Sequence, residues 1–204
     1  IKVTTVTAHE DGKADYSSEV ATLASAGGDA VAVIGYLDQG GKGIIQASLD
    51  SGAFDKFILS DGMIGQSLVD AFGKDLKKSF GSMPGSTGKG AGVFTGVAKN
   101  AGIDSSGPYT GESYDAAALI VLAMQAGGSA DRASIAKNVM DVANGPGTKI
   151  SPGELKKGLD LLAKGKKIDY EGATGVVFTS VGEAEGSFLE QEVKGGKFKT
   201  KKQR

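Results

Sequence analysis

Two polar side chains follow two apolar runs in the first third of the chain. The run 31–34 is followed by Tyr36 and the run 57–59 by Asp61, with one residue between in each case. A carboxylate accepts charge-assisted hydrogen bonds from an ammonium group, and a tyrosine offers a hydroxyl group beside an apolar ring. Taken singly, such residues are often only rim or turn residues. Together, Tyr36 and Asp61 have the chemistry to hold a small molecule that carries an amino group.

Alternating strand and helix patterns over residues 1 to about 83 position these two residues. Strand patterns cover 3–7, 31–34, 57–59 and 79–83, and helical spacing covers 16–26 and 43–49. This repetition predicts an α/β fold with a largely parallel sheet covered by helices on both faces. Because ligands of open α/β sheets bind at the carboxyl ends of the strands, we expect Tyr36 and Asp61 to share one binding edge.

The pattern changes after Pro84. The expected elements are helices over 90–101, 113–125, 130–142 and 151–163, followed by strands over 175–179 and 187–193. Ser113 and Ser151 are candidate N-caps. The helix 113–125 is apolar almost all round and should be buried, yet residues 84–170 offer hardly a strand for it to cover. We therefore expect the missing sheet to come from chain upstream of Ile1, and read the chain as a processed or truncated product.

Charge and composition exclude several classes of function. The chain of 204 residues has 23 basic and 24 acidic residues, so no strong field favours nucleic acid or an anionic membrane. The lysine-rich residues 198–204 are expected to be a solvated, frayed tail. The absence of cysteine excludes disulfides, thiolate chemistry and cysteine-rich zinc sites. No apolar run approaches the roughly 20 residues of a membrane span.

No set of residues predicts catalysis, a metal or a cofactor. His9 is the only histidine, and the sequence around it lacks the second histidine of a helical zinc motif, so a polar turn is the better interpretation. The segment 85–90 lacks the spacing of a phosphate-binding loop. The amides of residues 40–43 could cap a ligand carboxylate, although they lack dinucleotide-binding spacing. The chain is therefore not expected to be an enzyme.

Together these features resemble the periplasmic substrate-binding proteins of ABC importers, in the group that binds branched-chain and other amino acids. The resemblance spans nearly the whole chain, and it depends on the order and spacing of its segments more than on any one of them. These segments are Ala8-His9-Glu10-Asp11, Asp15-Tyr16, Gly35-Tyr36, Ile44-Ile45-Gln46-Ala47, Ser60-Asp61-Gly62, Glu112-Ser113-Tyr114-Asp115-Ala116-Ala117, Ala123-Met124-Gln125-Ala126, Pro152-Gly153-Glu154-Leu155 and Glu192-Val193-Lys194-Gly195-Gly196-Lys197.

The resemblance implies a type I periplasmic-binding-protein-like fold with doubly wound parallel sheets in two lobes joined by crossing strands. Residues 1–83 and 187–197 would form the second, C-terminal ligand-binding lobe. Residues 84–186 would be the hinge crossings and the returning helices of the first lobe, without its sheet. The opening strand and helix of the second lobe would also be absent.

The resemblance also implies roles for three residues. Asp61 matches the position that takes the α-ammonium group of the ligand, and Tyr36 matches the aromatic residue that closes over the main-chain end of the ligand. Tyr109 matches the aromatic residue near the ligand side chain. The best-known members have Glu where this chain has Asp61, so the position or chemistry of the ligand is expected to differ.

The implied function is that of a periplasmic, non-catalytic receptor for an amino acid or analogue. Its expected partners are the small-molecule ligand, ABC permease subunits and the missing N-terminal lobe, with no nucleic acid and no cofactor. One alternative is a ligand-sensing domain of a regulator or chemoreceptor with the same fold. Another is an α/β enzyme, which would need a cofactor in the crevice.

Overall fold

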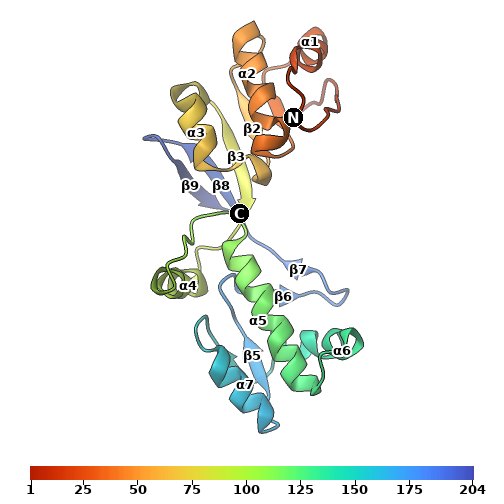
Figure 1. Ribbon diagram of the computed structural model, residues 1–204, viewed down its shortest axis with the longest axis vertical. Coiled ribbons are helices and arrows are strands. Elements are labelled where there is room, and N and C mark those ends of the chain that lie inside the picture. Colours follow the sequence, from red (N-terminus) through yellow and green to blue (C-terminus); the bar gives the residue numbers. More distant parts are fainter. The chain divides into compact units, whose positions relative to one another are not determined.

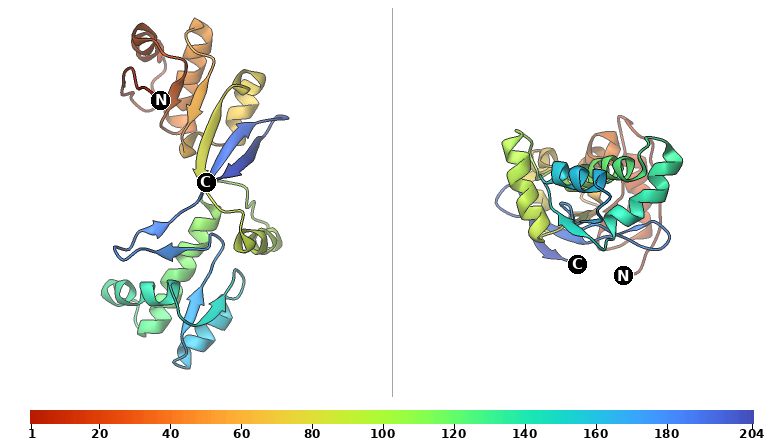
Figure 2. Two further views of the ribbon diagram at one scale, coloured as in Figure 1. Left: turned by 180° about the vertical axis from the view of Figure 1, so that it is seen from behind. Right: turned by 90° about the horizontal axis from the view of Figure 1, so that it is seen from below.

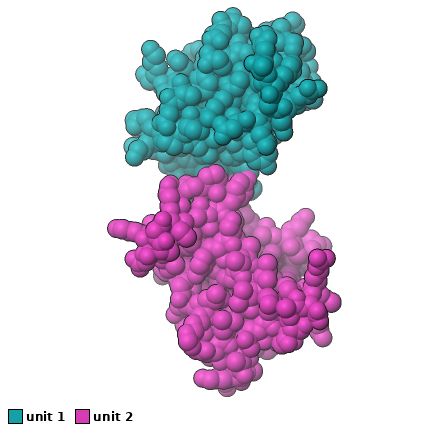
Figure 3. Space-filling view, viewed as in Figure 1, with its two compact units in different colours: residues 1–83, 188–204 teal, residues 84–187 magenta.

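The computed structural model describes all residues from Ile1 to Arg204, and the chain divides into two compact units. Unit 1 contains residues 1–83 and 188–204, and unit 2 contains residues 84–187 (Figure 3). The chain therefore leaves unit 1 after Met83 and returns to it at Phe188.

Unit 1 is built on a five-stranded sheet with the order β1-β2-β3-β8-β9 (Figure 1). Its strands are β1 (Val31–Val33), β2 (Phe57–Leu59), β3 (Phe80–Pro84), β8 (Phe188–Val193) and β9 (Phe198–Gln203), and its helices are α1 (Ser17–Ala26), α2 (Lys42–Ser51) and α3 (Gln66–Phe72). Strands β1, β2 and β3 pair in parallel, whereas β9 runs antiparallel to β8. The predicted parallel α/β organisation is thus confirmed.

The core of unit 1 lies on one face of this sheet. Val31 and Val33 are buried while Ala32 between them is exposed, and in β3 Met83 is buried while Phe80 is exposed. The buried side chains form a single cluster with residues of α1, α2 and α3. Figure 2 shows the same strands and helices from behind and from below. The three helices of unit 1 all pack on the same face, so residues 1–83 and 188–204 supply helical cover for only one of the two faces expected to be covered.

Both ends of unit 1 differ from the sequence-based expectation. Residues 3–7 form no strand, and Val3 and Val6 are exposed. Residues 198–203, in contrast, form β9 rather than a frayed tail, and Arg204 is held to Glu190 by hydrogen bonds of 2.9 and 2.6 Å. Lysine-rich edge strands are common because they discourage further strand addition, so the basic composition here is that of a sheet edge.

Unit 2 consists mainly of helices. They are α4 (Lys89–Asn100), α5 (Thr110–Gly127), α6 (Arg132–Ala143) and α7 (Leu155–Ala163), which accompany the strands β4 (Thr148–Ile150), β5 (Ile168–Tyr170), β6 (Val177–Phe178) and β7 (Ala184–Glu185). The four predicted helices are confirmed. Two further strands, β4 and β5, were not predicted from the sequence, and they pair in parallel. None of these helices is long and apolar enough to span a membrane.

Two predicted helix starts are wrong. Helix α5 begins at Thr110, three residues before the proposed cap Ser113. Helix α7 begins at Leu155 because Gly153 adopts a φ of 83° in the preceding turn. The carboxylate of Glu154 accepts a hydrogen bond of 3.0 Å from the backbone N–H of Ser151, as the acidic residue of a capping box does, although the helix itself starts only at Leu155.

Helix α5 is buried on one side only. Leu119 and Leu122 pack in a cluster with residues of α6, α7, β4 and β5. On the other side Ile120 and Val121 are 47% and 38% exposed. The expected burial of this helix is met on the side that packs on β4 and β5, and no element of this chain covers its other apolar side.

A buried carboxylate ties α5 to the segment 170–174. Asp115 accepts hydrogen bonds from the Tyr170 hydroxyl at 2.8 Å and from the backbone N–H groups of Ala173 and Thr174 at 2.7 and 2.8 Å. The Thr174 hydroxyl supplies a fourth bond at 2.7 Å. Burial, with the neighbouring Asp115 carboxylate, raises the pKa of Tyr170 well above its usual value. Asp115 is therefore a structural anchor rather than only a first-turn acidic residue.

Candidate functional site

The carboxyl ends of β1 and β2 lie side by side. Val33 pairs with Leu59, and the backbone N–H of Ser60 donates to the carbonyl oxygen of Val33 at 3.1 Å. The N–H of Gly35 donates to Ser60 Oγ at 3.3 Å. Tyr36 and Asp61 follow these residues directly, so their predicted placement at one sheet edge is confirmed.

The absence of a side chain at Gly62 permits this close approach. A Cβ atom at Gly62 would lie 2.4 Å from the carbonyl oxygen of Gly35 and 2.9 Å from Cδ1 of Tyr36. The ring of Tyr36 therefore lies against Gly62, next in sequence to Asp61. Tyr36 is 64% exposed and Asp61 is half-buried, with its Oδ1 accepting the N–H of Gly62 at 2.8 Å. An aromatic ring and a carboxylate thus border one accessible edge.

The segment after Tyr36 is held tightly rather than left open for a ligand. The N–H of Gly41 donates to the carbonyl oxygen of Tyr36 at 3.1 Å. Gly40 has a φ of 120°, and a Cβ atom there would lie 2.6 Å from the Tyr16 hydroxyl oxygen. The glycines in this segment therefore serve packing against Tyr16. The amide of Gly41, considered as a cap for a ligand carboxylate, is already bonded within the chain.

His9 borders the same edge, a position that was not predicted from the sequence. Its Nε2 would lie 3.3 Å from a Cβ atom at Gly35, and its ring packs edge-on to Tyr16 with centroids 5.9 Å apart. The Nδ1 atom of His9 is buried without a hydrogen-bond partner. No group of three or more His, Cys, Asp or Glu side chains in the chain could hold a metal ion.

Tyr109, the third predicted site residue, lies in unit 2. It is the residue before α5, it is 41% exposed, and it has a φ of 63°. A left-handed conformation at a non-glycine residue is strained and often marks a functional position. The structure therefore gathers Tyr36 and Asp61 at one edge of unit 1, whereas Tyr109 belongs to the other unit.

No family model matches this sequence. A curated relative, the chemotactic signal transduction system substrate-binding protein BasB of Halobacterium salinarum, is 39% identical over 70 residues, which are 34% of this chain and 17% of that protein. The leucine-binding protein LivK of Thermotoga maritima has a similar structure, with a TM-score of 0.68 and 20% identity over 94% of this chain and 49% of that chain. A solute-binding protein of an ABC transporter from R. palustris, solved with 4-hydroxybenzoate, has a TM-score of 0.64 and 12% identity over 95% of this chain and 50% of that chain.

The chain thus has the α/β fold of the type I periplasmic binding proteins. It spans about half the length of these solved chains and a smaller share of the curated relative. The proteins that share its fold include extracellular ligand-binding receptors and solute-binding proteins of ABC transporters.

Proposed function

We propose that this chain is part of an extracytoplasmic, periplasmic solute receptor that binds an amino acid or a close analogue and delivers it to an ABC permease. The observation that carries the proposal is the pairing of Tyr36 with Asp61 at the carboxyl ends of two parallel strands. Ligands of open α/β sheets bind at that edge. The proposed activity is binding without catalysis.

Each proposed site residue has a distinct task. The carboxylate of Asp61 accepts hydrogen bonds from the ligand ammonium group, which are stronger than neutral hydrogen bonds because both partners are charged. The ring of Tyr36, held against Gly62, covers the main-chain end of the ligand. Tyr109 packs near the ligand side chain. A branched-chain ligand suits this arrangement because no further charged partner is required for its side chain.

An NMR titration of the 204-residue chain tests the proposal. L-leucine carries an ammonium group, whereas 4-hydroxybenzoate carries a carboxylate without one. We expect L-leucine, and not 4-hydroxybenzoate, to shift the amide signals of Tyr36 and Gly62. Since the chain spans about half the length of its solved neighbours, we expect weak affinity, with a Kd of about 1 mM or above. Micromolar binding would contradict the expected weakness, and unshifted signals at saturating L-leucine would contradict the site.

A pair of aspartates at opposite ends of β2 gives a matched mutational test. Asp61→Asn keeps the size of the side chain but removes its charge, so L-leucine binding should weaken by at least about 1.5 kcal/mol. Asp55→Asn removes a charge that precedes β2 and pairs with Lys78, and it should leave binding unchanged. Equal effects of the two substitutions on affinity would remove Asp61 from the site.

A second candidate is a ligand-sensing protein that signals rather than transports. It is favoured by one observation, the 70-residue similarity to a substrate-binding protein of a chemotactic system. Deletion of the gene in its host distinguishes the two. Loss of labelled amino-acid uptake supports the transport role, whereas loss of the swimming response with normal uptake supports the sensing role.

A further inference from the structure

The imidazole ring of His9 has no task in the proposed function, although it borders the same edge as Tyr36 and Asp61. Its Nε2 and Cε1 atoms would lie 3.3 and 3.6 Å from a Cβ atom at Gly35, the residue before Tyr36. A Cβ atom at Gly62, the residue after Asp61, would lie 2.4 Å from the carbonyl oxygen of Gly35. Gly35 therefore borders both His9 and Gly62, and the imidazole ring lies next to the segments that carry the two proposed site residues.

The surroundings of this ring indicate which of its two nitrogens carries the hydrogen. A neutral imidazole ring has one N–H donor and one acceptor nitrogen. The Nδ1 atom of His9 is enclosed without a hydrogen-bond partner. The hydroxyl group of Tyr16, whose ring packs edge-on to the imidazole, donates to the carbonyl oxygen of Glu10 and accepts the N–H of Lys13, both at 3.0 Å. Because buried N–H groups without an acceptor are rarer than buried acceptors without a donor, Nδ1 is the nitrogen without hydrogen.

The hydrogen is therefore on Nε2, which is the less enclosed of the two nitrogens in a half-buried side chain. No hydrogen bond or ion pair within the chain engages this nitrogen. The cationic side chains of the neighbouring segments, Lys13 and Lys42, are already paired, with Glu19 at 2.6 Å and with Asp38 at 2.7 Å. The Nε2–H group of His9 is thus a donor that is available to a ligand at this edge.

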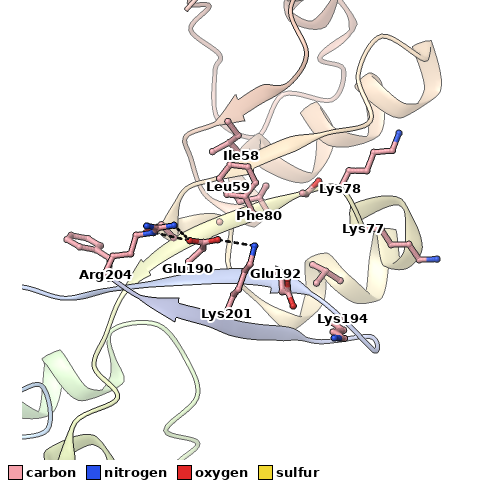
Figure 4. Close-up of a pocket in the computed structure, with 15 residues that line it drawn as sticks. Ile58, Leu59, Lys77, Lys78, Phe80, Glu190, Glu192, Lys194, Lys201 and Arg204 are labelled. Atoms are coloured by element: carbon pink, nitrogen blue, oxygen red, sulfur yellow. Dashed lines mark hydrogen bonds and ion pairs between the residues drawn. The ribbon is translucent and has the colours of Figure 1, made fainter. Parts of the chain in front are cut away.

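The hollow on the face of the unit 1 sheet opposite its helices is not part of this site (Figure 4). It lies over Phe80 and Phe188 of β3 and β8, and its lining includes neither His9 nor the two proposed site residues. In folds with helices on both faces of a mostly parallel sheet, such a face is covered by a helix of the same protein. Small molecules bind instead at the carboxyl ends of the strands.

We propose that His9 is a further ligand-binding residue, whose Nε2–H group donates a hydrogen bond to the carboxylate of the amino-acid ligand while Asp61 accepts hydrogen bonds from its ammonium group. The proposal rests on the function proposed above and names the groups that the ligand must carry. A hydrogen bond to a charged acceptor is stronger than a neutral one. A carboxylate has room for several donors, and His9 supplies one of them. The site therefore discriminates against amines that lack a carboxylate.

NMR of the imidazole nitrogens tests the proposal directly, because His9 is the only histidine of the chain. L-leucine is compared with isoamylamine, which is the same molecule without its carboxylate. At slightly alkaline pH, where histidine rings are neutral, the hydrogen should be found on Nε2. The Nε2 signal should shift with L-leucine and not with isoamylamine. A hydrogen on Nδ1, or an Nε2 signal that stays unshifted while the amides of Tyr36 and Gly62 respond to L-leucine, would overturn the role of His9 alone.

Two substitutions of His9 separate contact with the ligand from packing. His9→Gln keeps an N–H donor near the position of Nε2, whereas His9→Leu keeps apolar bulk against Tyr16 without a donor. The unmodified chain and His9→Gln should bind L-leucine at least about tenfold more tightly than isoamylamine, and His9→Leu should bind the two ligands within about twofold of each other. A merely structural role would weaken both ligands alike, so a preference for L-leucine that persists in His9→Leu would contradict the proposal.

Asp61→Asn shows whether a failure lies with His9 or with the site itself. Both ligands carry an ammonium group, so this substitution should weaken the binding of both and leave the preference for L-leucine in place. If L-leucine binds and Asp61→Asn changes neither affinity, or if L-leucine does not bind at all, the function proposed above fails and the role of His9 fails with it.

Discussion

At the scale of the residue, the proposed site depends on the glycine Gly62 as much as on the polar residues Tyr36 and Asp61. The ring of Tyr36 lies against the backbone next to Asp61 because Gly62 carries no side chain. The types and positions of both proposed site residues could be read from the sequence, since each follows an apolar run. The position of His9 could not, because its ring meets Gly35 and Gly40 through contacts between segments distant in sequence.

Removal of the charge of Asp115 is predicted to lower the stability of the protein more than removal of any other charge in unit 2. Asp115→Asn keeps the shape but cannot accept all four hydrogen bonds, so buried donors of the segment 170–174 lose their partner. We expect the free energy of unfolding to fall by about 3 kcal/mol in urea titrations. Asp160→Asn, which removes an exposed ion pair with Lys156, should change it by less than about 0.5 kcal/mol. Comparable losses in both variants would show that Asp115 is not an anchor.

At the scale of the element, the buried strands and the periodic helices were predictable from the sequence. The short strands β4 and β5 and the edge strand β9 were not. Short apolar runs sufficed to find β1 and β2, because their side chains enter the core. The strands β4 and β5 were not predicted, since each has a charged residue at its centre and lacks the apolar run that marks β1 and β2. The mixed polar pattern of β9 resembled a solvated tail, and only its pairing with β8 makes it a strand.

Two glycines within helices are predicted to respond oppositely to alanine. In α2, a Cβ atom at Gly43 would lie 2.6 Å from the Tyr16 ring, so Gly43→Ala should destabilise the protein by about 1–3 kcal/mol. In α4, Gly96 has nothing within 4 Å of that position, and Gly96→Ala should stabilise by up to about 1 kcal/mol through helix propensity. Urea unfolding of both variants checks this, and a stabilising Gly43→Ala would mean that α2 does not pack on Tyr16 as described.

The first turn of α1 is predicted to make stability depend on pH. Hydrogen bonds from Lys13 and Ser18 lower the pKa of Glu19 from 4.5 to about 2. Because the folded state favours the ionised carboxylate, this contribution is fully present above the ordinary pKa and is lost as the pH falls toward 2. Glu19→Gln should therefore be less stable than the unmodified chain at pH 7, and the difference should vanish near pH 2. A difference that is constant across this range would exclude the ionised pair as its cause.

At the scale of the whole molecule, the fold was predictable through its resemblance to known binding proteins, while its uncovered surfaces were not. The sequence patterns indicated helices on both sheet faces and a buried α5. The structure leaves the face of Phe80 and one side of α5 open. Sequence periodicity records which residues are apolar, but it does not record which element packs on them. Both open faces are therefore places where further polypeptide would stabilise the fold.

The most direct measurement of the central claim is an NMR experiment that detects contacts between L-leucine and the aromatic protons of Tyr36 in the 204-residue chain. If Tyr36 and Asp61 form one ligand-binding edge, magnetisation transfers between the Tyr36 ring and the leucine Cα proton, and the transfer disappears in Asp61→Asn while persisting in Asp55→Asn. Transfer from leucine to residues remote from this edge, or transfer from Tyr36 that survives Asp61→Asn unchanged, would contradict the account.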